Sequence, residues 1–157
     1  MPEERYMREA LRLAAEAERT GDIPVGCVIV RDGVILGRGR NRREERGDAT
    51  AHAELEAIRE ACEAAGSWRL EGAELYVTLE PCPMCAGGII NSRLRTVCYG
   101  AKEEKSGCCG SVLNLFEERF NHHPRVYGGV LERECREQLT EFFRTLRERE
   151  EKKDEAL

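Results

Sequence analysis

Two short apolar runs separated by a helix-length segment constrain the fold of this chain more than any other feature. Leu75 to Leu79 and Val97 to Gly100 have the composition of buried strands. Between them, Pro83 to Asn91 begins with proline, which is typical of the first turn of a helix. Two strands joined by a helix are expected to be parallel neighbours connected by a right-handed crossover. This segment therefore predicts an α/β fold.

The remaining segments extend this pattern. Apolar residues recur at helical spacing among charged residues in three places, and we expect amphipathic helices at residues 3–20, 52–65 and 131–148. In the second of these helices, the residues expected to be buried are Leu55, Ile58, Cys62 and Ala65. Val25 to Val30 and Val34 to Gly37 are joined by Asp32-Gly33, which is a strong hairpin signal. A polar loop is expected at residues 41–50.

The order helix, hairpin, helix, strand, helix, strand, helix predicts an α/β sandwich with helices on both faces of a mostly continuous sheet. Residues 101–124 show no regular pattern apart from a turn of helix near residues 112–116, and Val126 marks a last short strand. No repeat or linker divides the 157 residues, which is the length of one ordinary domain. We expect this domain at residues 1–150 and a frayed, charged tail at residues 151–157.

Charge and cysteine content exclude several classes of protein. The chain has 25 Lys and Arg against 30 Asp and Glu, whereas a general nucleic-acid coat protein would be basic, so any contact with nucleic acid must use a local patch. The longest apolar run is Cys27 to Val30, too short for a membrane span, and the charged start lacks the pattern of a secretory signal. We therefore expect a cytoplasmic protein without membrane association. Its eight cysteines are expected to be reduced, with some of them binding metal.

The strongest chemical signal joins the starts of two predicted helices. His52-Ala53-Glu54 opens one helix, and Pro81-Cys82-Pro83-Met84-Cys85 opens the next. Two cysteines at this spacing can bind one metal ion, and the N–H groups and dipole of a helix N-terminus favour their thiolate forms. With His52 as a third ligand, a tetrahedral zinc ion would keep its fourth position for water, as catalytic zinc sites do.

Cys-x-x-Cys also occurs in redox pairs and in structural zinc knots. A redox pair needs neither His52 nor Glu54. A structural knot needs a fourth ligand at a suitable spacing, and the adjacent pairs Cys108-Cys109 and His122-His123 are poor candidates for joint binding of one ion. The combination of residues therefore favours a catalytic zinc site.

Glu54 stands two residues after His52, close to the predicted metal without needing to bind it. Two thiolates and one imidazole cancel the charge of zinc, so deprotonation of water at such an ion benefits from a nearby carboxylate. The alternative is a solvated residue of the first helical turn that favours the helix dipole, and both roles are compatible. Beside an open metal position, a role for Glu54 in proton transfer is favoured.

His-Ala-Glu followed by Pro-Cys-x-x-Cys is the signature of the zinc-dependent cytidine and nucleotide deaminases, and the chain resembles the bacterial tRNA adenosine deaminases of this superfamily. The resemblance extends from about residue 6 to residue 147. It is carried by Ile23-Pro24-Val25-Gly26, Asn41, Thr50 to Glu54, Val77 to Gly87, Tyr99-Gly100-Ala101, Lys105-Ser106-Gly107, Gly110-Ser111, Asn121-His122 and Phe142-Phe143-Arg144.

The resemblance implies a three-layer α/β/α sandwich with a five-stranded mixed sheet, the cytidine deaminase-like fold. It implies one zinc ion per subunit, bound by His52, Cys82 and Cys85, with Glu54 as the catalytic proton carrier while water replaces the C6 amino group of adenine to leave inosine and ammonia. The implied substrate is the wobble adenosine in the anticodon loop of an arginine tRNA. The implied assembly is a homodimer whose active sites use residues of both subunits.

The anticodon loop is single-stranded, so its bases can enter pockets without the melting of a duplex. By resemblance, Asn41 helps to hold the target nucleoside, and its alternative role is to close a loop turn. The expected substrate-binding residues are Asn41, Ala53, Glu103, Lys105, Asn121 and Arg144, with Lys102, Arg147 and Phe142 or Phe143 as further candidates. The alternatives for the basic and aromatic candidates are a solvated helix face and core packing.

Several positions depart from the family pattern, among them residues 123–128. Glu103 stands where aspartate is more usual, which changes the reach of that carboxylate toward the substrate sugar, and Cys108-Cys109 replaces small residues.

Two other functions are weighed against the tRNA deaminase. A small-molecule deaminase for guanine, cytosine or a nucleoside would share every zinc residue, whereas a non-catalytic RNA-binding subunit is disfavoured because Glu54 is intact.

Overall fold

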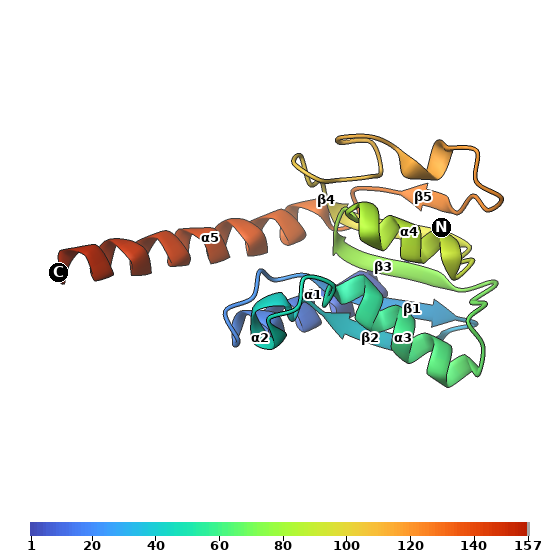
Figure 1. Cartoon of the computed structure of the whole chain (residues 1–157), viewed down its shortest axis with the longest axis horizontal. Coiled ribbons are helices and arrows are strands. Elements are labelled where there is room, and N and C mark those ends of the chain that lie inside the picture. Colours follow the sequence, from blue (N-terminus) through green and yellow to red (C-terminus); the bar gives the residue numbers. More distant parts are fainter. Residues whose placement is uncertain (157) are drawn as a thin grey trace.

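In the computed structural model, which describes residues 1–156, five strands form one mixed sheet with helices on both faces (Figure 1). The strands are β1 (Gly26–Arg31), β2 (Val34–Arg40), β3 (Glu74–Leu79), β4 (Thr96–Ala101) and β5 (Arg125–Tyr127). Their order is β2-β1-β3-β4-β5, in which β1 is antiparallel to both of its neighbours while β3, β4 and β5 are parallel. The predicted sandwich, the parallel pair β3–β4 and the last short strand are confirmed.

The helices divide between the two faces of the sheet. They are α1 (Glu4–Glu18), α2 (Arg43–Arg46), α3 (Ala53–Ala65), α4 (Pro83–Asn91) and α5 (Glu132–Glu155), with a 3-10 turn at Leu115–Glu117. Successive residues of a strand point to opposite faces, so Leu75 belongs to the core that includes residues of α3 and α4, while Tyr76 belongs to the core that includes residues of α1 and α5. The sheet therefore separates two hydrophobic cores, and α3 and α4 bring their N-termini together on one face (Figure 1).

The close contact between α3 and β2 was not predicted. The expected stripe of Leu55, Ile58, Cys62 and Ala65 is only partly buried, and the side that meets the sheet consists of Ala53, Ala57 and Ala61. The reason is the pair of glycines on β2: a Cβ at Gly39 would lie 2.1 Å from the Ala53 carbonyl oxygen, and one at Gly37 would lie 2.2 Å from that of Ala57. Small residues on both sides thus bring the start of α3 against the sheet.

Three predicted boundaries are wrong. The short helix α2 lies within the segment expected to be a loop, and β2 continues to Arg40. Helix α5 continues to Glu155, past the expected end at residue 148, although its second half projects beyond the sheet (Figure 1). Leu146, in this second half, is therefore 39% exposed. Ion pairs one turn apart, such as those of Arg144 with Glu141 and Glu148, support this half without core contacts.

The division of the chain at residue 150 falls inside α5 and stays a prediction, and Leu157 lies outside the described residues. None of the helices in residues 1–156 combines the length and the apolar character that a membrane span requires.

Candidate zinc and active site

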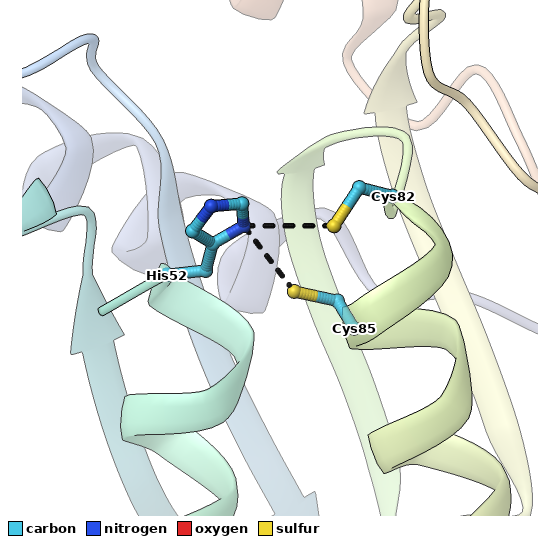
Figure 2. A group of neighbouring side chains, drawn as sticks. All are labelled: His52, Cys82 and Cys85. Atoms are coloured by element: carbon cyan, nitrogen blue, oxygen red, sulfur yellow. Dashed lines mark hydrogen bonds between the residues drawn. The ribbon is translucent and has the colours of Figure 1, made fainter. Parts of the chain in front are cut away.

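The predicted metal ligands come together between two helix starts. His52 immediately precedes α3, while Cys82 immediately precedes α4 and Cys85 lies in its first turn. Figure 2 shows the three side chains pointing toward one another. The His52 Nδ1 atom lies 3.6 Å from the Cys82 Sγ and 3.5 Å from the Cys85 Sγ. Residues that are thirty and more positions apart in sequence thus form one cluster.

The spacing of these atoms fits a tetrahedral zinc ion. Zinc binds nitrogen at about 2.0–2.1 Å and sulfur at about 2.3 Å, so a tetrahedral ion holds a nitrogen and a sulfur ligand about 3.6 Å apart. The three ligand atoms all lie within 4.8 Å of one another. Within residues 1–156, no fourth histidine, cysteine or carboxylate joins the cluster. Three protein ligands are the arrangement of a catalytic zinc site rather than of a closed structural one.

The thiols of the cluster differ in charge. A hydrogen bond from the Cys85 thiol lowers the pKa of Cys82 to about 4, and the same bond raises the pKa of Cys85. The hydrogen bond to Cys82 also raises the pKa of His52. Without metal, the cluster therefore holds one thiolate that attracts a cation and one thiol that releases its proton when the cation binds.

Glu54 lies in the first turn of α3, and its side chain is only 4% exposed. The reading of Glu54 as a solvated residue is thus wrong. Burial raises the pKa of Glu54 to about 7, and negative charge at Cys82 adds to the effect. A carboxyl group that titrates near neutral pH can both take up and release a proton, which is the property that general acid–base catalysis requires.

A cavity of about 250 Å³ opens beside the cluster. We call His52, Glu54, Cys82 and Cys85 the floor of the site. His52, Glu54 and Cys82 line the cavity, whereas Cys85 is fully buried and does not. The α2 wall consists of Asn41 and Arg43. The loop wall consists of Lys102, Glu103 and Ser106, which follow β4. The remaining lining residues are Ile23, Val25, Ala53, Leu79, Glu80, Leu139 and Phe143.

Three of the expected substrate-binding residues line this cavity, and three do not. Asn41, Ala53 and Glu103 line it, as does the further candidate Lys102. Lys105 lies on the same loop but is exposed, and Arg144 is exposed on α5, where it pairs with Glu141 and Glu148.

Asn121 is also exposed and lies outside the cavity. The ring of the adjacent His122 hydrogen-bonds to the Leu94 carbonyl, at 2.7 Å, and lines a separate hollow. That hollow is also lined by Glu74 and Thr96, at the starts of β3 and β4, so it lies at the end of the sheet opposite to the floor.

The position of Asn41 is compatible with both of its expected roles. Its side-chain amide donates a hydrogen bond to the Ile23 carbonyl (3.2 Å), and its side-chain oxygen accepts one from the Arg43 N–H (3.1 Å). It therefore closes the turn that leads into α2, and the same side chain faces the cavity.

Sequence reasoning missed the side chains that hold the two walls. Asp22 is fully buried and accepts hydrogen bonds from the backbone N–H groups of Glu44 (2.5 Å) and Glu45 (3.2 Å). These bonds fix the position of the first turn of α2. Glu80 is also buried and accepts hydrogen bonds from the loop that carries the loop wall. Arg43 was missed as well, and its basic side chain beside Asn41 was the available signal.

Residues 1–101 match the family model of the cytidine and deoxycytidylate deaminase zinc-binding region. The tRNA-specific adenosine deaminase of Bacillus subtilis is 53% identical over 94% of this chain and 92% of its own length. That of Agrobacterium fabrum is 47% identical over 90% of this chain and 94% of its own length. The chain belongs to the zinc-binding deaminases, in the family of the tRNA-specific adenosine deaminases. This deaminase therefore shares its family with relatives that it matches along nearly their whole length.

Solved structures agree with this assignment. One structure, from work on A-to-I editing by tRNA:A34 deaminases at the wobble position of transfer RNA, superposes with a TM-score of 0.83 at 46% identity, covering 87% of this deaminase and all of that chain. A guanine deaminase from Bacillus subtilis superposes with a TM-score of 0.61 at 43% identity, over 65% of this deaminase and 66% of that chain. The small-molecule alternative thus has less support.

Proposed function

We propose that this deaminase converts the wobble adenosine of an arginine tRNA to inosine, as a cytoplasmic homodimer that binds one zinc ion per subunit. The cavity above the floor carries the proposal. Its volume of about 250 Å³ lies below the range of about 300–1,000 Å³ that is usual for ligand pockets, so it suits one base whose sugar and phosphates stay outside. Arg43 on the α2 wall and Lys102 on the loop wall place positive charge beside this opening, as the phosphates of RNA require.

His52, Cys82 and Cys85 would hold the zinc ion. When bound, zinc supplies a Lewis acid that lets water act as a nucleophile at neutral pH. Glu54 takes the proton released by water and delivers protons to the purine ring and to the leaving amino group, so that adenosine and water become inosine and ammonia. Its burial beside the ligand cluster keeps this carboxyl in contact with the reacting groups and away from bulk solvent.

The remaining residues bind the substrate in this proposal. Asn41 and Ala53 contact the flipped nucleoside from the α2 side of the cavity, and Glu103 reaches the sugar from the loop wall. Lys105, Asn121 and Arg144 lie outside the cavity and are exposed, which suits contacts with neighbouring nucleotides of the anticodon loop. Contacts outside the pocket distinguish an RNA substrate from a free base.

The test is a comparison of substrates with the purified zinc-loaded protein. One substrate is an arginine anticodon stem-loop with adenosine at the wobble position, and the others are the same stem-loop with guanosine there, free guanine, free cytosine and adenosine. Mass spectrometry of the digested RNA measures inosine. We expect inosine from the first stem-loop only. Deamination of free guanine or cytosine without conversion of the stem-loop would contradict the proposal and favour the small-molecule alternative.

A further inference from the structure

Glu80 is a buried carboxylate beside the floor that the proposed chemistry does not use. It lies between β3 and Cys82, lines the cavity, and is only 2% exposed. It is not part of the metal-ligand cluster. Among the ion pairs of residues 1–156, none involves Glu80, although an ionised carboxylate in such a place is costly unless it is paired or hydrogen-bonded. Its partners must therefore be hydrogen-bond donors.

These donors all come from one short loop after β4. The Glu80 Oε1 atom accepts hydrogen bonds from the backbone N–H of Glu103 (3.1 Å) and from the hydroxyl of Ser111. The Oε2 atom accepts them from the backbone N–H groups of Cys109 (2.8 Å) and Ser111 (3.2 Å). One carboxylate thus joins the beginning and the end of the segment at residues 103–111.

The middle of the same segment packs directly on the carboxylate. A Cβ added at Gly107 would lie 2.4 Å from the Glu80 carboxyl carbon and from its Oε2 atom, closer than real contacts allow. The backbone N–H of Cys108 donates a hydrogen bond to the Pro81 carbonyl at 2.8 Å. The loop therefore curls around Glu80 and is attached to the residues that lead into Cys82.

This attachment sets the position of the loop wall. Glu103, which donates one of the four hydrogen bonds, lines the cavity with Lys102 and Ser106. An apolar side chain of similar size would fill the same space but would leave three backbone N–H groups without an acceptor. The carboxylate is thus required for the shape of the loop, and the loop carries one side of the cavity.

We infer that Glu80 is a positioning residue for the RNA substrate, because it holds Lys102 and Glu103 where they meet the sugar and phosphates of the flipped nucleotide. This inference rests on the proposed function. It goes beyond that function because it separates two carboxylates of the cavity, Glu54 in the floor and Glu80 beside it. Glu54 moves protons, whereas Glu80 acts through the backbone of the loop and affects how well RNA is bound.

The test compares three variants of the full chain, each loaded with zinc. Glu80→Gln replaces one of the two accepting oxygens by a donor, and Ser111→Ala removes only the hydroxyl partner, so it is the milder change. Glu74→Gln is the matched control, since Glu74 lies at the other end of β3 and only pairs with Arg95 on the surface. Each variant is measured for zinc content, for kcat and KM on the anticodon stem-loop, and for the rate of trypsin cleavage after Lys102 and Lys105.

For Glu80→Gln we expect unchanged zinc content, trypsin cleavage in the loop about tenfold faster, and a KM raised about tenfold with kcat changed by less than about threefold, because loss of uniform binding raises KM alone. Ser111→Ala should show smaller changes in the same direction, and Glu74→Gln should match the unaltered protein.

Two results would overturn the inference. In the first, Glu80→Gln leaves both the trypsin cleavage and the KM unchanged, which would indicate at most a role in overall stability. In the second, the loop is cleaved faster while the KM stays the same. Trypsin cleavage does not depend on the substrate, so failure of the proposed function would appear separately, as an unaltered protein that does not convert the stem-loop.

Discussion

The floor and the walls of the cavity are held in place in different ways. His52, Glu54, Cys82 and Cys85 stand at the starts of α3 and α4, two helices packed on the sheet. The walls lie on a four-residue helix and an irregular loop, each attached through its backbone to a buried carboxylate. The floor is therefore positioned by regular structure and the walls by Asp22 and Glu80. We expect changes to the floor to reduce turnover and changes to the walls to weaken substrate binding.

The largest effect is expected from removal of a metal ligand. Cys85→Ala takes away a fully buried sulfur of the cluster, so zinc should be lost and turnover should fall below detection. Elemental analysis of the purified protein measures the zinc content. Cys98→Ala is the control, since Cys98 is equally buried but lies in the core on the other face of the sheet. Full zinc content in Cys85→Ala would show that the cluster is not the metal site.

The second effect concerns Glu54, the part of the floor that does not bind metal. Glu54→Gln should keep zinc and folding but lower kcat by about a hundredfold or more, because general acid–base catalysis contributes about 10²–10⁴ in rate. KM should change little. Glu56→Gln is the control on the same helical turn, where the side chain pairs with Arg46. The rate of inosine formation in a single turnover is compared between the variants and the unaltered protein. An unchanged rate in Glu54→Gln would reject the proton-transfer role.

A smaller effect is expected at the α2 wall. Asp22→Asn takes away one of the two oxygens that accept from α2, and a hydrogen bond to a charged group contributes about 1.5–3 kcal/mol of stability. KM for the stem-loop should rise several-fold while kcat is kept, in contrast to Glu54→Gln. Asp32→Asn at the tip of the β1–β2 hairpin is the control, because asparagine tolerates its positive φ of 51°. A fall in kcat with an unchanged KM would break the distinction between floor and walls.

The smallest effects are expected from basic residues outside the cavity. Lys105→Ala and Arg144→Ala should each reduce the salt dependence of RNA binding by about 0.7 in the slope of log affinity against log salt, if each contacts one phosphate of a single strand. Titrations of the stem-loop at several salt concentrations measure this slope. Arg59→Ala, on the exposed side of α3, should leave it unchanged. An unaltered slope for Lys105→Ala or for Arg144→Ala would show that the substituted residue does not contact an RNA phosphate.

The regular elements of this fold were predictable because their signals are local. The Asp32-Gly33 turn, the proline at the start of α4 and the apolar runs of β3 and β4 each depend on residues next to one another. The error about the buried side of α3 arose because this side depends on distant contacts. α3 packs through its alanines because the glycines of β2 lie opposite them, and neither segment by itself reveals this pairing.

The floor was predictable for a related reason. His52, Cys82 and Cys85 stand at or next to helix starts, which can be located from the sequence. Because only a few residue types can bind zinc, these three residues could be selected as ligands without the structure. The burial of Glu54 was not predictable, because it depends on what packs around the first turn of α3. Its contact with the cluster of His52, Cys82 and Cys85 and its raised pKa follow from that packing.

The amino-acid sequence alone thus determined the α/β fold, the deaminase signature and the residues of the floor. Only the tertiary structure decided how the walls are held, because Asp22 and Glu80 bind backbone N–H groups that are more than twenty positions away. Every residue except proline carries the same backbone N–H group. A carboxylate that pairs with such groups therefore leaves no sign of its partner in the sequence.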